Sequence, residues 1–196
     1  MLYNSYVFIF FFLGYLILMQ SRHKRFKLWT TLGASVVFYA YWDWRFLGLL
    51  LLSAFVDYLS AIKIGNGKRY WLYFSLGVNL SVLFVFKYFG FFATELGQLL
   101  GVSPNIPQFI LPLGISFYTF QTMSYTLDVY RGEIQPEKDF PKFVLYIIYF
   151  PQLIAGPIER ARFLLPQFNF NQKPQWGKGL GLFIAGFTLK VCLADN

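Results

Sequence analysis

The sequence predicts an all-α polytopic membrane protein. Of its 196 residues, 57% are hydrophobic and only 13% are charged, whereas charged residues make up about a quarter of a typical soluble domain. Several long runs contain no charged residue: 1–21, 28–42, 70–86, 96–127 and 143–158. A helix needs roughly 20 mostly apolar residues to cross the hydrocarbon core of a bilayer. These runs therefore favour several membrane spans over the interior of a water-soluble protein.

The first half of the chain predicts four spans, at 2–20, 28–42, 46–62 and 70–89. Between them, "SRHKRFK" carries four Lys or Arg residues, "DWR" carries one and "KIGNGKR" carries three. Lys and Arg accumulate in cytoplasmic loops, so we expect the first and third loops in the cytoplasm and the N-terminus outside. No basic residues precede the first run and no small-residue cleavage site follows it, which indicates a retained helix and not a signal peptide.

Asp57 is a carboxylate inside the third predicted span. An ionisable group in a membrane helix faces either a partner or a wet cavity, because its exposure to lipid is costly. Of these two interpretations we favour a hydrogen bond between helices.

The segment 110–130 is apolar but contains many polar side chains: Ser116, Thr119, Gln121, Thr122, Ser124, Thr126 and Asp128. Polar groups are costly in lipid unless they face protein or water. At about 100° per residue, one side of a helix presents Phe117, Gln121, Ser124 and Asp128. We therefore expect this helix inside the bundle, with its polar stripe on a cavity.

The next apolar run, 143–158, ends in Gly156-Pro157 and is followed at once by Glu159 and Arg160. Proline removes a backbone donor and clashes with the preceding turn, so a helix must kink or end there. If 110–128 and 143–158 both crossed the bilayer, the basic stretch 159–178 would lie outside, against the positive-inside tendency. One of the two segments is therefore expected to enter the membrane without crossing it, where irregular backbone needs protein or water around it.

The residues by themselves identify no catalytic centre. No phosphate loop, nucleophile elbow, zinc motif or dinucleotide fingerprint is present, and the single histidine, His23, lies in a basic loop. One cysteine, Cys192, excludes a disulfide framework and a multi-cysteine metal site. No metal site and no bound cofactor are expected. The net charge of +8 follows from basic cytoplasmic loops and does not indicate nucleic-acid binding. A transporter or channel fits this composition as well as an enzyme does.

Two stretches, "LPLGISFYTFQTMSYTLDVYRG" and "YFPQLIAGPIERARFLLPQF", resemble the signature region of membrane-bound O-acyltransferases, especially the bacterial alginate O-acetyltransferase type. Four further segments are similar to that branch in the same order: "NSYVFIFFFLGYL", "VVFYAYWDWRFLGLL", "FKYFGFF" and "GFTLKVCLADN". The resemblance covers essentially the whole chain, as the N-terminal portion of one membrane-embedded domain. Residues 179–194 predict the start of another helix, and we expect the sequence to be truncated.

The resemblance implies a helix bundle around a central funnel in a bacterial inner membrane. It implies transfer of an acyl group, for the closest branch acetyl from acetyl-CoA, from the cytoplasm toward a partner protein or an exported polysaccharide such as alginate. The family's catalytic histidine is expected beyond residue 196, so we expect the fragment alone to be inactive. Five side chains are expected to line the substrate channel: Gln121, Asp128, Arg131, Glu159 and Arg160. Four residues shape the two motifs: Pro112, Gly114, Gly156 and Pro157.

Other functions stay open at this point. The chain also resembles, less closely, the D-alanyl transfer proteins of teichoic acid modification. A transporter or flippase would be expected to show paired broken helices in inverted repeats, and the sequence contains one broken region without an internal repeat. A non-catalytic membrane scaffold would fit only a naturally complete chain. Neither the acceptor polymer, the acyl donor nor the oligomeric state follows from the residues.

Overall fold

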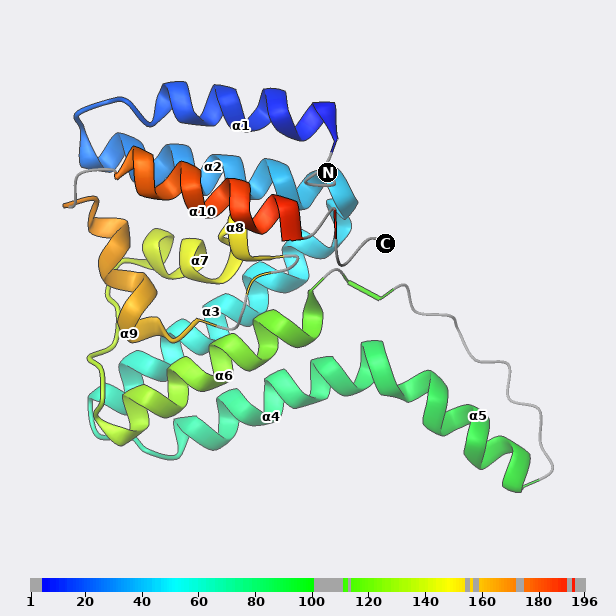
Figure 1. Ribbon diagram of the computed structural model, residues 1–196. Coiled ribbons are helices and arrows are strands. Elements are labelled where there is room, and N and C mark those ends of the chain that lie inside the picture. Colours follow the sequence, from blue (N-terminus) through cyan, green and yellow to red (C-terminus); the bar gives the residue numbers. More distant parts are fainter. Residues whose placement is uncertain are drawn as a thin grey trace.

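The computed structural model describes residues 5–100, 111–112, 114–153, 156, 159–171, 175–189 and 192. Every regular element in these residues is a helix, as predicted. In chain order they are α1 (Tyr6–Leu18), α2 (Lys24–Asp43), α3 (Arg45–Gly65), α4 (Trp71–Leu83), η1 (Phe84–Tyr88), α5 (Phe89–Leu99), α6 (Ile115–Arg131), α7 (Phe140–Ile148), α8 (Phe150–Leu153), α9 (Ala161–Leu164), η2 (Leu165–Asn169) and α10 (Trp176–Leu189). Figure 1 shows their arrangement.

Helices occupy all four segments where spans are predicted: α1, α2 and α3 cover the first three, and α4 with η1 covers the fourth. Among the described residues, two continuous stretches are long and apolar enough to cross a membrane, Arg45–Gly65 and Trp71–Leu96. Tyr6–Leu18 is a shorter apolar helix. These features fit an all-α membrane protein.

The second of these stretches contains an irregular turn. Residues Phe84–Tyr88 form the π-helix η1, in which each backbone hydrogen bond reaches one residue further than in an α-helix. α5 continues from it, and Figure 1 shows α5 pointing away from the other helices. Within η1, the Lys87 ammonium donates a hydrogen bond of 3.1 Å to Ser116 Oγ, which attaches this turn to the start of α6.

α6 lies at the centre of the fold, packed against α3, α4 and α7. Tyr118, Thr122 and Tyr125 are almost completely buried, which confirms that this helix sits inside the bundle. Its two ends are flanked by glycines with positive φ, Gly114 at 71° and Gly132 at 76°. Only glycine adopts this left-handed conformation without strain, so the two glycines fix where the helix begins and ends.

α4 and α6 run antiparallel to each other. At one end, the Arg69 guanidinium, just before α4, lies 5.4 Å from the ring centre of Tyr130 in the last turn of α6. At the other end, Lys87 reaches Ser116 in the first turn of α6. The connections before α4 and after α6 are therefore neighbours.

Most of the basic loops lie at that same end. Lys142 Nζ, at the start of α7, donates a hydrogen bond of 3.1 Å to Asn169 Oδ1, and Lys24 Nζ donates one of 2.6 Å to Asn171 Oδ1. The turn 132–139 lies against the last residue of α3, since a Cβ added at Gly65 would be 2.7 Å from Pro136 Cγ. Ten of the 17 Lys and Arg residues belong to the four segments that gather here. We call this the basic end; it comprises 21–27, 63–70, 131–142 and 165–171.

α7 starts at the basic end and is broken after nine residues. Tyr149, with φ −52° and ψ 107°, is not helical, and the four-residue α8 follows it. Pro151 explains the break, because it cannot donate the hydrogen bond that would continue the helix. The interruption thus comes earlier than the predicted one at Gly156. Of that predicted pair, Gly156 lies outside a helix and Pro157 falls outside the described residues. By Asn169 the chain is back at the basic end.

Candidate functional site

The start of the broken segment, at Phe150, is held on one side by α1 and α2. The backbone N–H of Phe150 donates a hydrogen bond of 3.2 Å to Ser35 Oγ on α2, so a donor released by the broken helix is satisfied in the protein interior. The Phe150 ring is buried, and its centre lies 5.3 Å from that of Phe11 and 5.1 Å from that of Tyr15. Edge-on aromatic contacts at such distances are favourable. The irregular backbone therefore lies in a packed environment.

On its other side the segment is joined to α6 through Gln121 and Tyr146. Gln121 Nε2 donates a hydrogen bond of 2.7 Å to the carbonyl oxygen of Tyr146 on α7. The Tyr146 hydroxyl lies 3.3 Å both from the carbonyl oxygen of Gln121 and from that of Glu159. Tyr146 of α7 thus links α6 to the chain after the break. The three hydrogen bonds of this group are buried or partly buried.

A small cavity lies where these parts meet. Its volume is about 10 Å³, and Gln121, Gln152 and Gly156 are among the residues that line it. A cavity of that size is near the minimum for one water molecule. At Gly156 the backbone approaches closely, because an added Cβ would lie 2.7 Å from both Cα and O of Gln152. Any larger residue at this position would force the backbone or Gln152 to shift.

A second polar cluster joins α3, α4 and α6. Asp57 is fully buried, and its Oδ1 accepts hydrogen bonds of 2.6 Å from Ser75 Oγ and 2.7 Å from Asn79 Nδ2, both on α4. Thr122 of α6 reaches Asn79 Oδ1 at 3.5 Å. The helix–helix hydrogen bond favoured from the sequence is confirmed. Among the described residues, Asp57 Oδ2 has no hydrogen-bond partner, and no cation pairs with this carboxylate.

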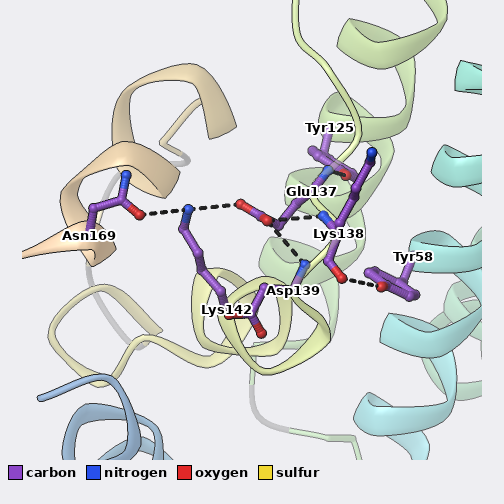
Figure 2. A network of polar contacts seen from close by, with 7 residues as sticks. All are labelled: Tyr58, Tyr125, Glu137, Lys138, Asp139, Lys142 and Asn169. Carbon is purple, nitrogen blue, oxygen red and sulfur yellow. Dashed lines mark hydrogen bonds and ion pairs between the residues drawn. The ribbon is translucent and has the colours of Figure 1, made fainter. Parts of the chain in front are cut away.

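The basic end contains a third network, drawn in Figure 2. Glu137 Oε1 accepts backbone hydrogen bonds from Lys138 and Asp139, at 2.9 and 3.1 Å. Its other oxygen, Oε2, lies 2.9 Å from Lys142 Nζ. Both side chains of this ion pair are less than one-fifth exposed, at 18% and 14%. Because Lys142 also contacts Asn169, Glu137 and Lys142 connect the turn before α7 to η2.

Tyrosine hydroxyls attach the same turn to the neighbouring helices. Tyr125 of α6 accepts a hydrogen bond of 2.9 Å from the backbone N–H of Glu137, and Tyr58 of α3 donates one of 2.6 Å to the carbonyl oxygen of Lys138 (Figure 2). The turn is therefore fixed by α3, α6 and α7 together.

Two of the residues expected to line a channel, Gln121 and Asp128, are buried on α6. Gln121 lines the small cavity, whereas Asp128 Oδ2 has no partner among the described residues. Arg131 is exposed and lies 3.9 Å from Glu133. The structure thus separates Arg131, at the basic end, from Gln121, and their shared role in a channel stays a prediction.

The other two expected channel residues, Glu159 and Arg160, directly precede α9. Glu159 offers its carbonyl oxygen to Tyr146, and Arg160 is exposed, with its own carbonyl accepting from Leu164 N at 3.3 Å. No ion pair between Glu159 and Arg162 is formed in the described structure; the Arg162 guanidinium lies 4.7 Å from the ring centre of Phe163 instead.

The four motif residues have different surroundings. Pro112 accepts a hydrogen bond of 3.3 Å from Ile115 N, and Gly114 forms the turn before α6. Both belong to the entry into the central helix. Gly156 lies at the close approach to Gln152, while Pro157 is not among the described residues.

Sequence reasoning missed Ser75, Asn79, Glu137, Lys142 and Tyr146. Ser75 and Asn79 are separated by four residues inside a charge-free run, so they share a helix face, and that spacing could have paired them with Asp57. Glu137 and Lys142 sit in a mixed-charge loop in which the sequence favours no particular pair.

In the described residues, no cluster of three or more His, Cys, Asp or Glu side chains could hold a metal ion. His23 is exposed at the start of α2. Among the described residues, no carboxylate forms a hydrogen bond or ion pair with its ring. The described part of the site is therefore a broken helix whose backbone is held by buried hydrogen bonds to α2 and α6.

Comparison with known proteins gives the family. The chain is 36% identical over 212 residues to the protein named "Probable alginate O-acetylase AlgI" of Azotobacter vinelandii, covering 100% of this chain and 42% of that one. It is 36% identical over 237 residues to the peptidoglycan O-acetyltransferase of Helicobacter pylori, covering 100% and 45%. A teichoic acid D-alanyltransferase of Lacticaseibacillus rhamnosus is 25% identical over 150 residues, covering 74% and 34%.

No family model and no solved structure matches the chain. The chain spans less than half the length of the curated relatives that it matches. Its resemblance to the O-acetyltransferases extends over every one of its residues, including the two motifs that surround the broken helix. The chain belongs to the membrane-bound O-acyltransferase family.

Proposed function

We propose that this chain forms part of a membrane O-acyltransferase that transfers acetyl groups from a cytoplasmic thioester, acetyl-CoA, to a polysaccharide of the cell envelope or an exported one. The observation that carries the proposal is the similarity, over the whole of this chain and less than half of each relative, to proteins named as an alginate O-acetylase and a peptidoglycan O-acetyltransferase. The lower identity to a D-alanyltransferase over part of the chain makes D-alanyl transfer the weaker alternative.

In this reaction a hydroxyl oxygen of the acceptor attacks the thioester carbonyl while a base takes the hydroxyl proton. The C–S bond then breaks, and the departing sulfur receives that proton from the base and leaves as the thiol. Such a step needs a positioned base and a site that excludes water from the thioester. We propose that the base, a histidine, comes from a part of the longer protein outside these residues. The 196 residues would then be inactive alone and would supply part of the wall of a central funnel.

We also propose an orientation in the inner membrane. Ten of the 17 basic residues lie at the basic end, and such residues favour the cytoplasmic side. α1 ends beside the basic segment 21–27, so its N-terminus would lie outside. The basic residues after Glu159 would then be cytoplasmic. This agrees with the positive-inside tendency, which two full crossings by 110–128 and 143–158 would violate.

In this orientation, 143–158 is the segment that enters without crossing. α7 has nine residues and rises about 13 Å, far less than the ~30 Å of the hydrocarbon core. Asn169 meets Lys142 at the end where α7 began. Two hydrogen bonds support this proposal: the Phe150 N–H donates to Ser35, and Gln121 donates to the Tyr146 carbonyl. Irregular backbone deep in a membrane requires such protein contacts.

The channel roles of Arg131, Glu159 and Arg160 are part of the same proposal. Arg131 is exposed at the basic end, where it could meet an anionic thioester donor such as acetyl-CoA. Arg160 is also exposed, beside the carbonyl that Tyr146 contacts. Guanidinium groups bind phosphate and carboxylate with two parallel hydrogen bonds, a property suited to both substrates.

The test uses the full-length protein in sealed vesicles with acetyl-CoA inside and an acceptor outside. Release of free thiol that depends on alginate or on peptidoglycan fragments is expected, and it identifies the acceptor class. Acetyl-CoA that stays intact with every polysaccharide, while D-alanyl thioester is consumed, would replace the proposal by the alternative. The transporter hypothesis predicts movement of a solute without any loss of thioester.

A further inference from the structure

An apolar groove of about 750 Å³ lies between α1 and α10. From α1 it is lined by Ile9, Leu13 and Leu16 among others, and from α10 by Gly179, Leu180 and Phe183. Leu13, Leu180 and Phe183 are each more than half exposed, at 51%, 61% and 59%. The two helices thus present apolar faces to a shared space without closing it. Its volume falls within the range of about 300–1,000 Å³ that small-molecule sites occupy.

One mouth of the groove opens at the basic end. Leu16 lies in the last turn of α1, just before the basic segment 21–27. The hydrogen bond from Lys24 to Asn171 brings the chain back to this segment, and α10 begins five residues later at Trp176. α10 runs back along α1, since residues of both helices line the groove, and Figure 1 shows the two helices pointing in opposite directions.

The charges at this mouth have one sign. Arg22, Lys24 and Arg25 are exposed, as is Lys178 in the first turn of α10. None of them forms an ion pair within the part of the chain that the structure describes. No Asp or Glu occurs in 1–42 or in 160–194, so neither sequence segment around the groove provides a counter-ion. An anion supplied from outside would complement this mouth.

We propose that the groove binds an anionic phospholipid of the cytoplasmic leaflet, with one acyl chain along α1 and α10 and its phosphate at Arg22, Arg25 and Lys178. The proposal rests on the orientation proposed above. Clusters of Lys and Arg directly beside a membrane helix attract anionic headgroups, and an apolar groove in the bilayer suits a hydrocarbon chain. A second protein helix would cover the apolar faces, but it would not explain why the mouth is uniformly basic.

Native mass spectrometry of the full-length protein, incubated with phosphatidylglycerol or phosphatidylcholine, tests the site. We expect phosphatidylglycerol to be retained preferentially. Gly179→Phe should reduce retention by filling the groove, whereas the matched control Gly181→Phe should not. A Cβ meets nothing within 4 Å at either glycine, and only Gly179 lines the groove.

Two double variants, each lacking two positive charges, test where the lipid headgroup binds. Arg22→Gln with Arg25→Gln should weaken phosphatidylglycerol binding by about tenfold or more and leave phosphatidylcholine unchanged. Lys63→Gln with Lys68→Gln removes the same charge from another loop of the basic end and should have no effect. Lys24 is kept, since it holds Asn171. Each variant must elute as a single species before it is compared.

Equal retention by the Gly179 and Gly181 variants, or of the two lipids, would overturn the proposal. So would a photo-crosslinker at position 13 that captures only protein, because a later segment or a second copy would then fill the groove. Lipid retention is measured without acyl transfer, so the loss of one activity does not imply the loss of the other. If a cysteine in place of Arg22 reacts only from outside the cell, the orientation fails and the leaflet assignment fails with it.

Discussion

Gln121 and Tyr146 are joined twice, because the side chain of each one contacts the backbone carbonyl of the other. Gln121 Nε2 donates to the Tyr146 carbonyl at 2.7 Å, and the Tyr146 hydroxyl lies 3.3 Å from the Gln121 carbonyl. The pair joins the central helix to the helix that breaks, so the position of the broken segment depends on it.

Gln121→Leu should destabilise the full-length protein, because it leaves the Tyr146 carbonyl buried without its donor. The expected loss is about 1–3 kcal/mol in the free energy of unfolding, measured by denaturation in detergent. Gln167→Leu makes the same change at an exposed glutamine and should cost little. Equal losses in the two variants would contradict a special role for Gln121.

Asp57 should tolerate asparagine better than alanine. Alanine leaves the Ser75 and Asn79 donors without their acceptor, at an expected cost of about 1–3 kcal/mol. Asparagine keeps one acceptor oxygen and should retain most of the stability. The thermal midpoints of both variants are to be compared with that of Glu95→Ala, which removes an exposed carboxylate. A midpoint for Asp57→Ala equal to the control value would exclude a stabilising cluster.

The ion pair between Glu137 and Lys142 should show measurable coupling in a double-mutant cycle with Glu137→Gln and Lys142→Met. Both side chains are mostly buried, so we expect at least about 1 kcal/mol. The pair Arg131–Glu133, at 3.9 Å and largely exposed, serves as the control and should show close to zero, as exposed pairs commonly do. High salt should reduce the coupling of the exposed pair more than that of the buried one.

Gly156→Ala should perturb the broken segment. The added methyl would lie 2.7 Å from the backbone of Gln152, so the chain must move, and we expect lower acyl transfer with reduced stability. In Gly33→Ala, inside α2, the new Cβ meets nothing within 4 Å, and better helix propensity should make it neutral or slightly stabilising. Full activity of Gly156→Ala would show that this close approach is dispensable.

Single cysteines, introduced after Cys192 and any other cysteine of the full-length protein have been replaced, should report the orientation. Positions 68 and 138, at the basic end, should react with a membrane-impermeant maleimide only from the cytoplasmic side. Position 44, between α2 and α3, should react only from outside. A cysteine at position 162 should behave like position 68 if 143–158 returns to the side it entered from, and like position 44 if it crosses.

The sequence predicted the helical class well because hydrophobic length and the spacing of basic loops are local properties. The burial of α6 followed from its many polar side chains, which lipid does not accept. The partners of those side chains did not follow. Asn79 contacts Asp57 across 22 residues and Gln121 contacts Tyr146 across 25, and such pairings depend on helix rotation, which composition does not set.

The place of the helix break was predicted only in part. Gly156-Pro157 is the stronger local signal, but the helix already ends at Tyr149. Pro151 would also be tolerated in the first turn of a helix, so its effect depends on whether another partner satisfies the released backbone groups. Ser35, 115 residues away, provides that partner for Phe150, and no local pattern reveals it.

The wide turn at Phe84–Tyr88 has a consequence for how insertions and deletions act on this protein. Because i→i+5 hydrogen bonds accommodate one residue more per turn than an α-helix does, removing a single amino acid there should restore ordinary winding and leave α5 with nearly the same rotation. A deletion inside α4 or α5 would instead rotate everything beyond it by about 100°. A one-residue deletion at Phe84–Tyr88 should therefore be tolerated better than one in either neighbouring helix.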